Sequence, residues 1–216
     1  MTENPQVLTR QLESTLATNS VIRNTYILLS LTLLFSALTA GVAMATNAPM
    51  LNVWLVLGGY FGLLFATHKL RNSAWGLLAV FALTGFMGYT LGPLLNAYIG
   101  HYANGAQLVV YALGGTGVIF ISLSAYALTT RKDFSFMGGF LMAGILIAFL
   151  AGIANIFFAM PGLALAVSTM FMLLMCGLIL YETSNLVHGG ETNYILATVG
   201  LYVTIYNLFT SLLHLL

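Results

Sequence analysis

Seven long runs of apolar residues cover most of this 216-residue chain. Each run is close to the roughly 20 residues that an α-helix needs to cross the hydrocarbon core of a membrane. Lipid offers the backbone no hydrogen-bond partners, so each run must be helical, because an open sheet would leave its edges unpaired. The sequence therefore predicts an all-α membrane protein, a bundle of seven transmembrane helices. The runs are Tyr26–Ala45, Leu51–Thr67, Trp75–Ile99, Leu108–Thr129, Phe136–Phe157, Leu163–Thr183 and Tyr194–Leu215.

Composition and spacing indicate a single membrane domain. Only 5% of the residues are charged, against about 25% in soluble domains. The connections between the runs are short, so neighbouring helices are expected to be antiparallel. We expect the transmembrane domain to cover residues 23–216. Residues 1–22 are polar and poor in apolar side chains, so a flexible cytoplasmic tail is expected there.

The basic residues predict the orientation in the membrane. Two precede the first run, two follow the second and two follow the fourth, so all six share one side of the bilayer. Cytoplasmic loops carry the excess of Lys and Arg in membrane proteins. We therefore expect a cytoplasmic N-terminus and, with an odd number of spans, a C-terminus outside. The six are Arg10, Arg23, Lys69, Arg71, Arg131 and Lys132.

Small residues recur at helical spacing within several runs. Such faces let helix backbones approach closely. Packing inside the bundle is the favoured interpretation, and dimerisation is the alternative. The sets are Gly58 with Gly62, Gly88 with Gly92, and Gly144 with Ala148 and Gly152.

No arrangement of residues predicts an enzyme, a metal site or a cofactor. The chain has neither a Gly-x-Ser-x-Gly elbow nor a His-Glu-x-x-His motif. An intramembrane serine protease using Ser168 or Ser211 with His214 is an alternative that nothing in the sequence selects. The net charge of +1 and the lack of a basic stripe give no indication of a nucleic-acid partner.

Glu182 is the exceptional side chain, because it is an acidic residue inside the sixth apolar run. A carboxylate costs roughly 2.5–3.5 kcal/mol at mid-membrane on insertion scales, and such residues usually face a bundle interior with a partner. The last two spans form a hairpin, across which Thr204 is expected to approach Glu182. The alternative is that Glu182 extends its carboxylate to the cytoplasmic interface.

Three further polar residues join Glu182 and Thr204 as candidates for sensing protons or ions. His188 and Glu191 lie in the predicted turn between the last two runs, and Asn207 lies in the seventh run. For Asn207 a simple hydrogen bond between helices is the favoured interpretation.

Several stretches of the chain resemble the Bax inhibitor family of seven-helix membrane proteins, over residues 23 to 210. The signature is a Tyr-acid pair in the sixth helix, followed by Leu-Tyr-x-x-Ile-x-Asn-Leu-Phe in the seventh. The stretches that carry the resemblance are Tyr181–Glu182, Leu201–Phe209, Arg23–Tyr26, Leu128–Asp133, Ala154–Phe157 and His188–Ile195.

The resemblance implies two functions of different kinds. Family members are described as pH-sensitive calcium or cation leak pathways, gated by an acidic pair at the cytoplasmic ends of the last two helices. A bacterial member instead modulates FtsH, a membrane-anchored ATP-dependent protease. In this chain Glu182 holds the first acidic position and Thr204 the second. Two carboxylates that share a proton titrate as a coupled pair, and Thr204 removes that pair.

We therefore expect a non-enzymatic modulator of an FtsH-type protease in the bacterial inner membrane. Its expected partners are the protease, the membrane proteins associated with that protease, and the lipid bilayer. The polar tail over residues 1–22 is a candidate for first contact with the protease, and an inert tail is the alternative. The other functional hypothesis is a pH-sensitive calcium or cation leak centred on Glu182, for which calcium or protons are the ligands.

Overall fold

The computed structural model describes the backbone of residues 5–216 and the side chains from residue 18 onward. Seven of its helices are long and apolar enough to cross a membrane, as the sequence predicts. No strand occurs in the described backbone, and a short 3-10 helix, η1 (Ser135–Met137), precedes the fifth span. The α-helices are α1 (Pro5–Ala45), α2 (Val53–Leu70), α3 (Ala74–His101), α4 (Gly105–Thr130), α5 (Gly138–Phe158), α6 (Pro161–Val187) and α7 (Tyr194–Leu215).

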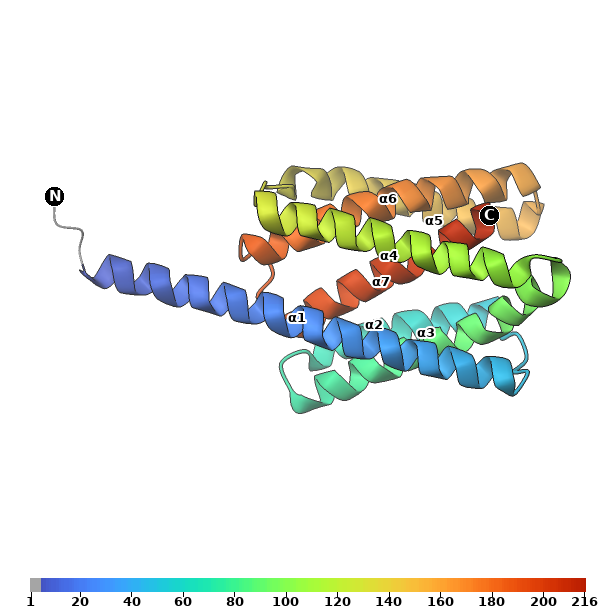
Figure 1. The fold of residues 1–216 in the computed structure, drawn as a ribbon, viewed down its shortest axis with the longest axis horizontal. Helices are drawn as coiled ribbons and strands as arrows, with labels where there is room; N and C mark the ends of the chain where they lie inside the picture. Colours follow the sequence, from blue (N-terminus) through green and yellow to red (C-terminus); the bar gives the residue numbers. More distant parts are fainter. Residues whose placement is uncertain (1–4) are drawn as a thin grey trace.

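The last helix lies at the centre of the bundle. Helices α1, α2 and α3 pack together on one side, and α4, α5 and α6 on the other, while α7 crosses diagonally between the two groups (Figure 1). Of the seven spans, α7 has the largest buried share. The polar and apolar side chains of α7 therefore determine how the two groups of helices are joined.

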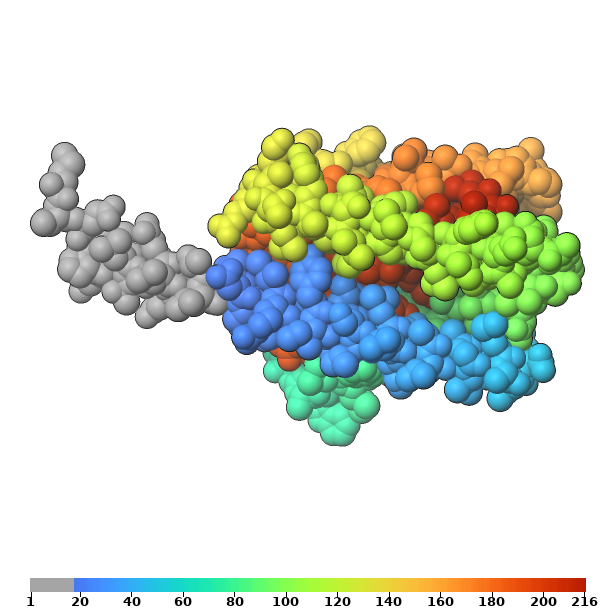
Figure 2. Space-filling model, viewed as in Figure 1, coloured from blue at the N-terminus to red at the C-terminus, as the bar shows by residue number. Residues whose placement is uncertain are grey.

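A groove separates α1 from α4 on the face shown in Figure 2, where α7 is visible in red at its base. Its volume is about 460 Å³, and Tyr202, Ile205 and Phe209 of α7 line it. The two helix groups thus make their contact through α7 more than through each other.

Glycines permit the close contact between α1 and α3. A Cβ on Gly88 would collide with the carbonyl oxygen of Ser36 and lie 2.7 Å from the Ser36 hydroxyl. At Gly92 the collision would be with the Ala43 methyl group. The predicted packing role is confirmed for this pair.

The glycine pair in α2 has different surroundings from the pair in α3. Gly58 and Gly62 of α2 are exposed, and a Cβ on either would meet nothing within 4 Å. The expectation of packing inside the bundle is therefore wrong for these two glycines, because their face of α2 points away from the other helices.

The tail expected over residues 1–22 lies largely outside the described side chains. Residues 18–22 are helical and continue into the first span without a break. The expected boundary before residue 23 is therefore not marked by an end of α1, and the flexibility of the tail stays a prediction.

The connections α2–α3, α4–α5 and α6–α7 lie together at one end of the bundle, and the C-terminus lies at the opposite end (Figure 1). Arg71, Arg131 and Lys132 lie in the first two of these connections, and Lys69 lies in the last turn of α2. We refer to this end as the basic end. The grouping fits the predicted orientation, in which the basic end faces the cytoplasm.

Reporter fusions test that orientation. A reporter active only outside the cytoplasm is expected to be active when fused after Leu216. The same reporter inserted between Gly189 and Gly190 is expected to be silent, because the α6–α7 turn is at the basic end. The reverse pattern would show that the chain is inserted the other way.

Candidate functional site

The Glu182 carboxyl group faces α7. The hydroxyl of Thr204 donates a hydrogen bond to Glu182 Oε2 over 3.0 Å. Thr204 is buried, and Glu182 is half-buried. The approach that the hairpin predicts between these two side chains is therefore present in the structure.

Gly200 provides the space for this carboxyl group. It lies one turn before Thr204 on α7, and a Cβ added to it would lie 2.7 Å from Glu182 Oε1. Any larger residue at position 200 would push against the carboxyl group. Gly200 and Thr204 together form a short seat for Glu182 on the surface of α7.

The seat lies inside the span, not at its edge. Gly200 and Thr204 are six and ten residues beyond the start of α7 at Tyr194. At 1.5 Å per residue they lie about 9 and 15 Å along the helix. Glu182 is five residues before the end of α6, about 8 Å from it. The side chain thus points across to α7, and the alternative of a carboxylate extended to the interface does not describe this geometry.

No second carboxyl group joins Glu182 within the described residues. The other two acidic side chains in that part of the chain are Asp133 and Glu191, and both lie in connections outside the spans. Thr204 occupies the position at which the family resemblance places the second acid. The geometry therefore gives one carboxyl group with one hydroxyl donor.

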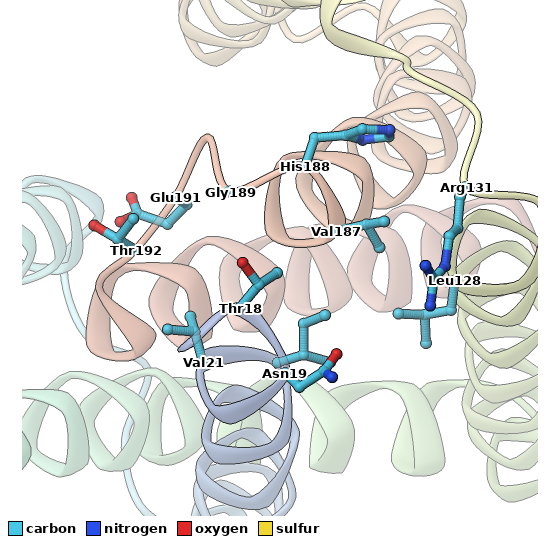
Figure 3. A pocket seen from close by; sticks show the side chains of 11 residues that line it. Thr18, Asn19, Val21, Leu128, Arg131, Val187, His188, Gly189, Glu191 and Thr192 are labelled. Carbon is cyan, nitrogen blue, oxygen red and sulfur yellow. The ribbon is translucent and has the colours of Figure 1, made fainter. Parts of the chain in front are cut away.

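A separate cleft opens at the basic end, between α1, the end of α4 and the α6–α7 turn. Its volume is about 750 Å³. Arg131 and His188 lie on one flank, Glu191 and Thr192 lie on the other, and Asn19 of α1 lies below them (Figure 3). The cleft thus presents charges of both signs close to the point where α1 joins the bundle.

Ser184 fastens the end of α6 to the α4–α5 connection and also bonds His188, one turn further on. His188 Nδ1 donates to the Ser184 carbonyl oxygen over 2.9 Å, since a carbonyl can only accept. The Ser184 hydroxyl accepts from the Phe134 amide over 3.0 Å and donates to the Lys132 carbonyl oxygen over 3.2 Å. Ser184 therefore holds the end of α6 against the α4–α5 connection.

Asn193 fastens the start of α7 in a similar way. Its side-chain oxygen accepts from the amides of Ile195 and Leu196, which caps the helix. Its side-chain nitrogen donates to the Arg71 carbonyl oxygen over 3.1 Å, in the α2–α3 connection. Glu191 Oε1 accepts from the Asn193 amide over 2.7 Å. Glu191 thus has a structural partner in the turn itself.

The five predicted site residues therefore fall in three places. Glu182 and Thr204 form a pair, His188 and Glu191 lie on the cleft, and Asn207 is apart from both. The Asn207 amide nitrogen donates to the Val203 carbonyl oxygen over 2.8 Å, within its own helix. The expectation of a hydrogen bond to another helix is wrong for Asn207, because a backbone acceptor one turn away is nearer.

Three residues of the site were not singled out by sequence reasoning: Gly200, Ser184 and Asn193. Asn193 carried a usable signal, since an Asn directly before an apolar run is a typical helix cap. Gly200 and Ser184 carried none, because their roles depend on which distant residues lie opposite them.

The Asp133 carboxyl group at the basic end is held by a hydrogen bond within its own connection. The Ser135 amide donates to Asp133 Oδ1 over 2.8 Å, which holds the pKa of that carboxyl group below its usual value.

The described residues contain no group of three or more potential metal ligands. His214 Nδ1 donates to the Thr210 carbonyl oxygen over 2.7 Å, and no hydrogen bond in this part of the chain joins it to Ser168 or Ser211. The serine protease alternative thus has no support in the geometry.

Replacing Asn193 by alanine is expected to destabilise the basic end. Loss of a helix cap costs about 0.5–2 kcal/mol, and the bond to the α2–α3 connection is lost as well. We expect a drop of about 1–2 kcal/mol in the free energy of unfolding in mixed micelles. Asn104→Ala is the matched control, because Asn104 precedes α4 without capping it through its side chain. Equal losses in both variants would contradict this role for Asn193.

Comparison with protein-family models shows the family to which the chain belongs. The family model "Inhibitor of apoptosis-promoting Bax1" matches residues 18–216. The chain belongs to the Bax inhibitor family. Among its relatives in this family is the Escherichia coli K12 protein named "Modulator of FtsH protease YccA". The two are 53% identical over 203 residues, which cover 94% of this chain and 92% of the relative.

Other members of the Bax inhibitor family are similarly close. An uncharacterised protein of Pseudomonas aeruginosa is 55% identical over 195 residues, covering 90% of this chain and 87% of its own length. A protein of a second Escherichia coli strain, 53% identical over 203 residues that cover 94% of this chain and 92% of its own length, is named "Inner membrane protein YccA". With seven apolar helices, the chain is a multi-pass protein of the inner membrane.

Proposed function

We propose that this chain is a non-enzymatic modulator of an FtsH-type, membrane-anchored, ATP-dependent protease. The observation that carries the proposal is the likeness to the Escherichia coli protein named as a modulator of FtsH, which extends over 94% of this chain. The seven-helix bundle supports a role inside the membrane, where such a protease is anchored.

The packing of α1 supports a mechanism in which the protein occupies the protease and is processed slowly. A protease that pulls from the N-terminus must first detach α1. That helix is held by the close contact at Gly88 and Gly92 of α3. It is also held by the bond between Ser36 and Tyr202 of α7. Separating these contacts in lipid is expected to slow extraction.

In this mechanism the tail over residues 1–22 makes the first contact with the protease. The cleft at the basic end lies next to the point where that segment joins the bundle. Its mixed charges, from Arg131 and His188 on one side and Glu191 on the other, suit a polar protein surface. The protease and its associated membrane proteins are the proposed partners.

Recovery of native complexes tests the proposal. The tagged protein, produced at its natural level and solubilised in mild detergent, is expected to recover the protease. An unrelated multi-pass membrane protein with the same tag serves as the control. Equal recovery of the protease with the control, or none with the tagged protein, would contradict the proposed partnership.

A second candidate function is a proton-sensitive cation leak, favoured by the seat of Glu182 against Gly200 and Thr204. Under this proposal Glu182→Gln changes the cation flux into reconstituted vesicles, whereas the control Asp133→Asn, at an acidic residue in the α4–α5 connection, leaves it unchanged. The double change Glu182→Asp with Thr204→Asp introduces two coupled carboxyl groups and strengthens the response of the flux to pH. Absence of flux in the wild type and in the double variant would exclude the leak.

A further inference from the structure

A second groove lies against α7, between α2 and α3 on one side and α5 and α6 on the other; we call it the α2–α5 groove. Its volume is about 520 Å³. Binding sites for small molecules usually have 300–1,000 Å³ and apolar walls with a few polar groups. The polar residues that line this groove are Tyr60, Thr90, Tyr206 and Asn207.

These polar residues lie at hydrocarbon depth. Tyr60 is the eighth of 18 residues in α2, and Tyr206 is the thirteenth of 22 in α7. Asn207 follows Tyr206 directly. No water is present at this depth to satisfy polar groups, so donors without a partner are costly there.

The hydroxyl hydrogens of Thr90 and Tyr206 are both already used in hydrogen bonds within the protein. The Thr90 hydroxyl donates to the Met87 carbonyl oxygen over 2.7 Å. Its single hydrogen is then used, so in the 3.2 Å contact with Tyr206 the tyrosine hydroxyl is the donor. Neither Thr90 nor Tyr206 has a donor left for a ligand.

Two other donors remain unused. Asn207 has two hydrogens on its side-chain nitrogen, and one of them goes to the Val203 carbonyl oxygen. The Tyr60 hydroxyl makes no hydrogen bond within the described part of the chain. The groove therefore offers two donors, one from α2 and one from α7, to a molecule that brings acceptors.

The residues that line the α2–α5 groove indicate what kind of molecule it can bind. None of the described residues that line the groove carries a charge, which disfavours a phosphate, carboxylate or ammonium head group. Aromatic rings from five helices surround the space, and flat rings stack well on such walls. The aromatic residues are Tyr60, Phe61, Phe86, Phe149, Phe171 and Tyr206.

We propose that the α2–α5 groove binds an isoprenoid quinone. Its planar ring lies among the aromatic side chains, and its carbonyl oxygens accept hydrogen bonds from Tyr60 and Asn207. Its apolar tail leaves the groove sideways into the bilayer. An acyl chain of a phospholipid would fill the space but leave both donors unpaired.

A transmembrane helix of a partner protein is the competing occupant. A helix is about 10 Å wide, so it would need an unbroken channel between α2 and α5. Phe61 and Phe149 also contact each other edge to face, with ring centroids 6.0 Å apart, which joins α2 to α5 across the groove. A flat, narrow ligand fits this space better than a helix. The quinone proposal does not rest on the protease proposal.

The test is binding of decylubiquinone to the full chain in lipid nanodiscs. The wild type is expected to bind it saturably. Tyr60→Phe and Asn207→Leu each remove one donor, and each is expected to weaken binding about fivefold, the effect of one hydrogen bond. Tyr111→Phe is the matched control, because Tyr111 is exposed on α4 and does not line the groove.

A second variant keeps the test decisive if a polar substitution disturbs folding. Met142→Trp adds bulk at the mouth of the groove from a side chain that is 70% exposed, so it is expected to abolish binding without touching either donor. The proposal is overturned if the double variant Tyr60→Phe with Asn207→Leu binds decylubiquinone as tightly as Tyr111→Phe. It is also overturned if palmitate, or a peptide helix, displaces the quinone at equal concentration.

Discussion

Replacing Gly88 by valine is expected to force α1 away from α3 and to reduce the free energy of unfolding by about 3 kcal/mol, the upper end of the usual cost of overpacking. The new Cβ would collide with the Ser36 carbonyl oxygen and the Thr39 hydroxyl. Because the first of these is backbone, it cannot move aside as a flexible side chain would. The free energy of unfolding in mixed micelles containing SDS, followed by circular dichroism, measures the loss.

Gly62→Val is the matched control for Gly88→Val. Both glycines are in helix interiors, so the change in helix propensity is the same, but a Cβ on Gly62 meets nothing within 4 Å. We expect the control to retain its free energy of unfolding to within about 0.5 kcal/mol. If the two variants lose equal stability, the effect comes from propensity and not from the α1–α3 contact.

Tyr202→Ala is expected to cost about 3–5 kcal/mol, as removal of a large buried aromatic side chain does. Tyr202 is 1% exposed and sits in the central helix α7. Its hydroxyl lies 2.6 Å from the Ser36 hydroxyl of α1 and donates to the Thr84 carbonyl oxygen of α3 over 3.2 Å. Its loss thus weakens the attachment of α7 to α1 and α3.

Two further variants separate the causes. Tyr202→Phe keeps the ring and removes only the hydroxyl, so a loss of about 1 kcal/mol is expected, as for hydrogen bonds between membrane helices. Tyr111→Ala removes a tyrosine that is 61% exposed on α4 and is expected to change stability little. A loss in Tyr202→Phe as large as that in Tyr202→Ala would show that the hydrogen bonds, and not packing, hold α7 in place.

The spans were predictable because a segment that crosses the hydrocarbon core must have mostly apolar side chains and a backbone that is hydrogen-bonded within the segment. The helix ends lie within four residues of the predicted ones, as in α2, which begins at Val53 instead of Leu51, except that α1 begins at Pro5 instead of Tyr26. Local capping decides such ends, and Asn52 caps α2 by accepting from the Trp54 amide.

The Glu182–Thr204 contact was predictable from chain length alone. A short turn places the sixth and seventh spans side by side. Counting residues puts Glu182 about 8 Å and Thr204 about 15 Å from the turn, a difference that the long glutamate side chain can bridge. The seat at Gly200 was not predictable, because one glycine among many has no distinguishing mark until its neighbour on α6 is known.

The lateral arrangement of the helices was the least predictable feature. Gly58 with Gly62 and Gly88 with Gly92 show the same four-residue spacing, yet one pair is exposed and the other lies in the close contact between α1 and α3. Which face meets which depends on the shapes of residues far apart in the chain. For the same reason, nothing in the sequence indicated that α7 would be the central helix.

The most direct test of the proposed function is the lifetime of other membrane substrates of the FtsH-type protease, followed by pulse-chase labelling. Overproduction of this chain is expected to lengthen those lifetimes, because the slowly extracted bundle occupies the protease. An unrelated multi-pass membrane protein, overproduced to the same level, is expected to leave them unchanged. Substrate lifetimes that are the same with and without this chain would contradict its role as a modulator.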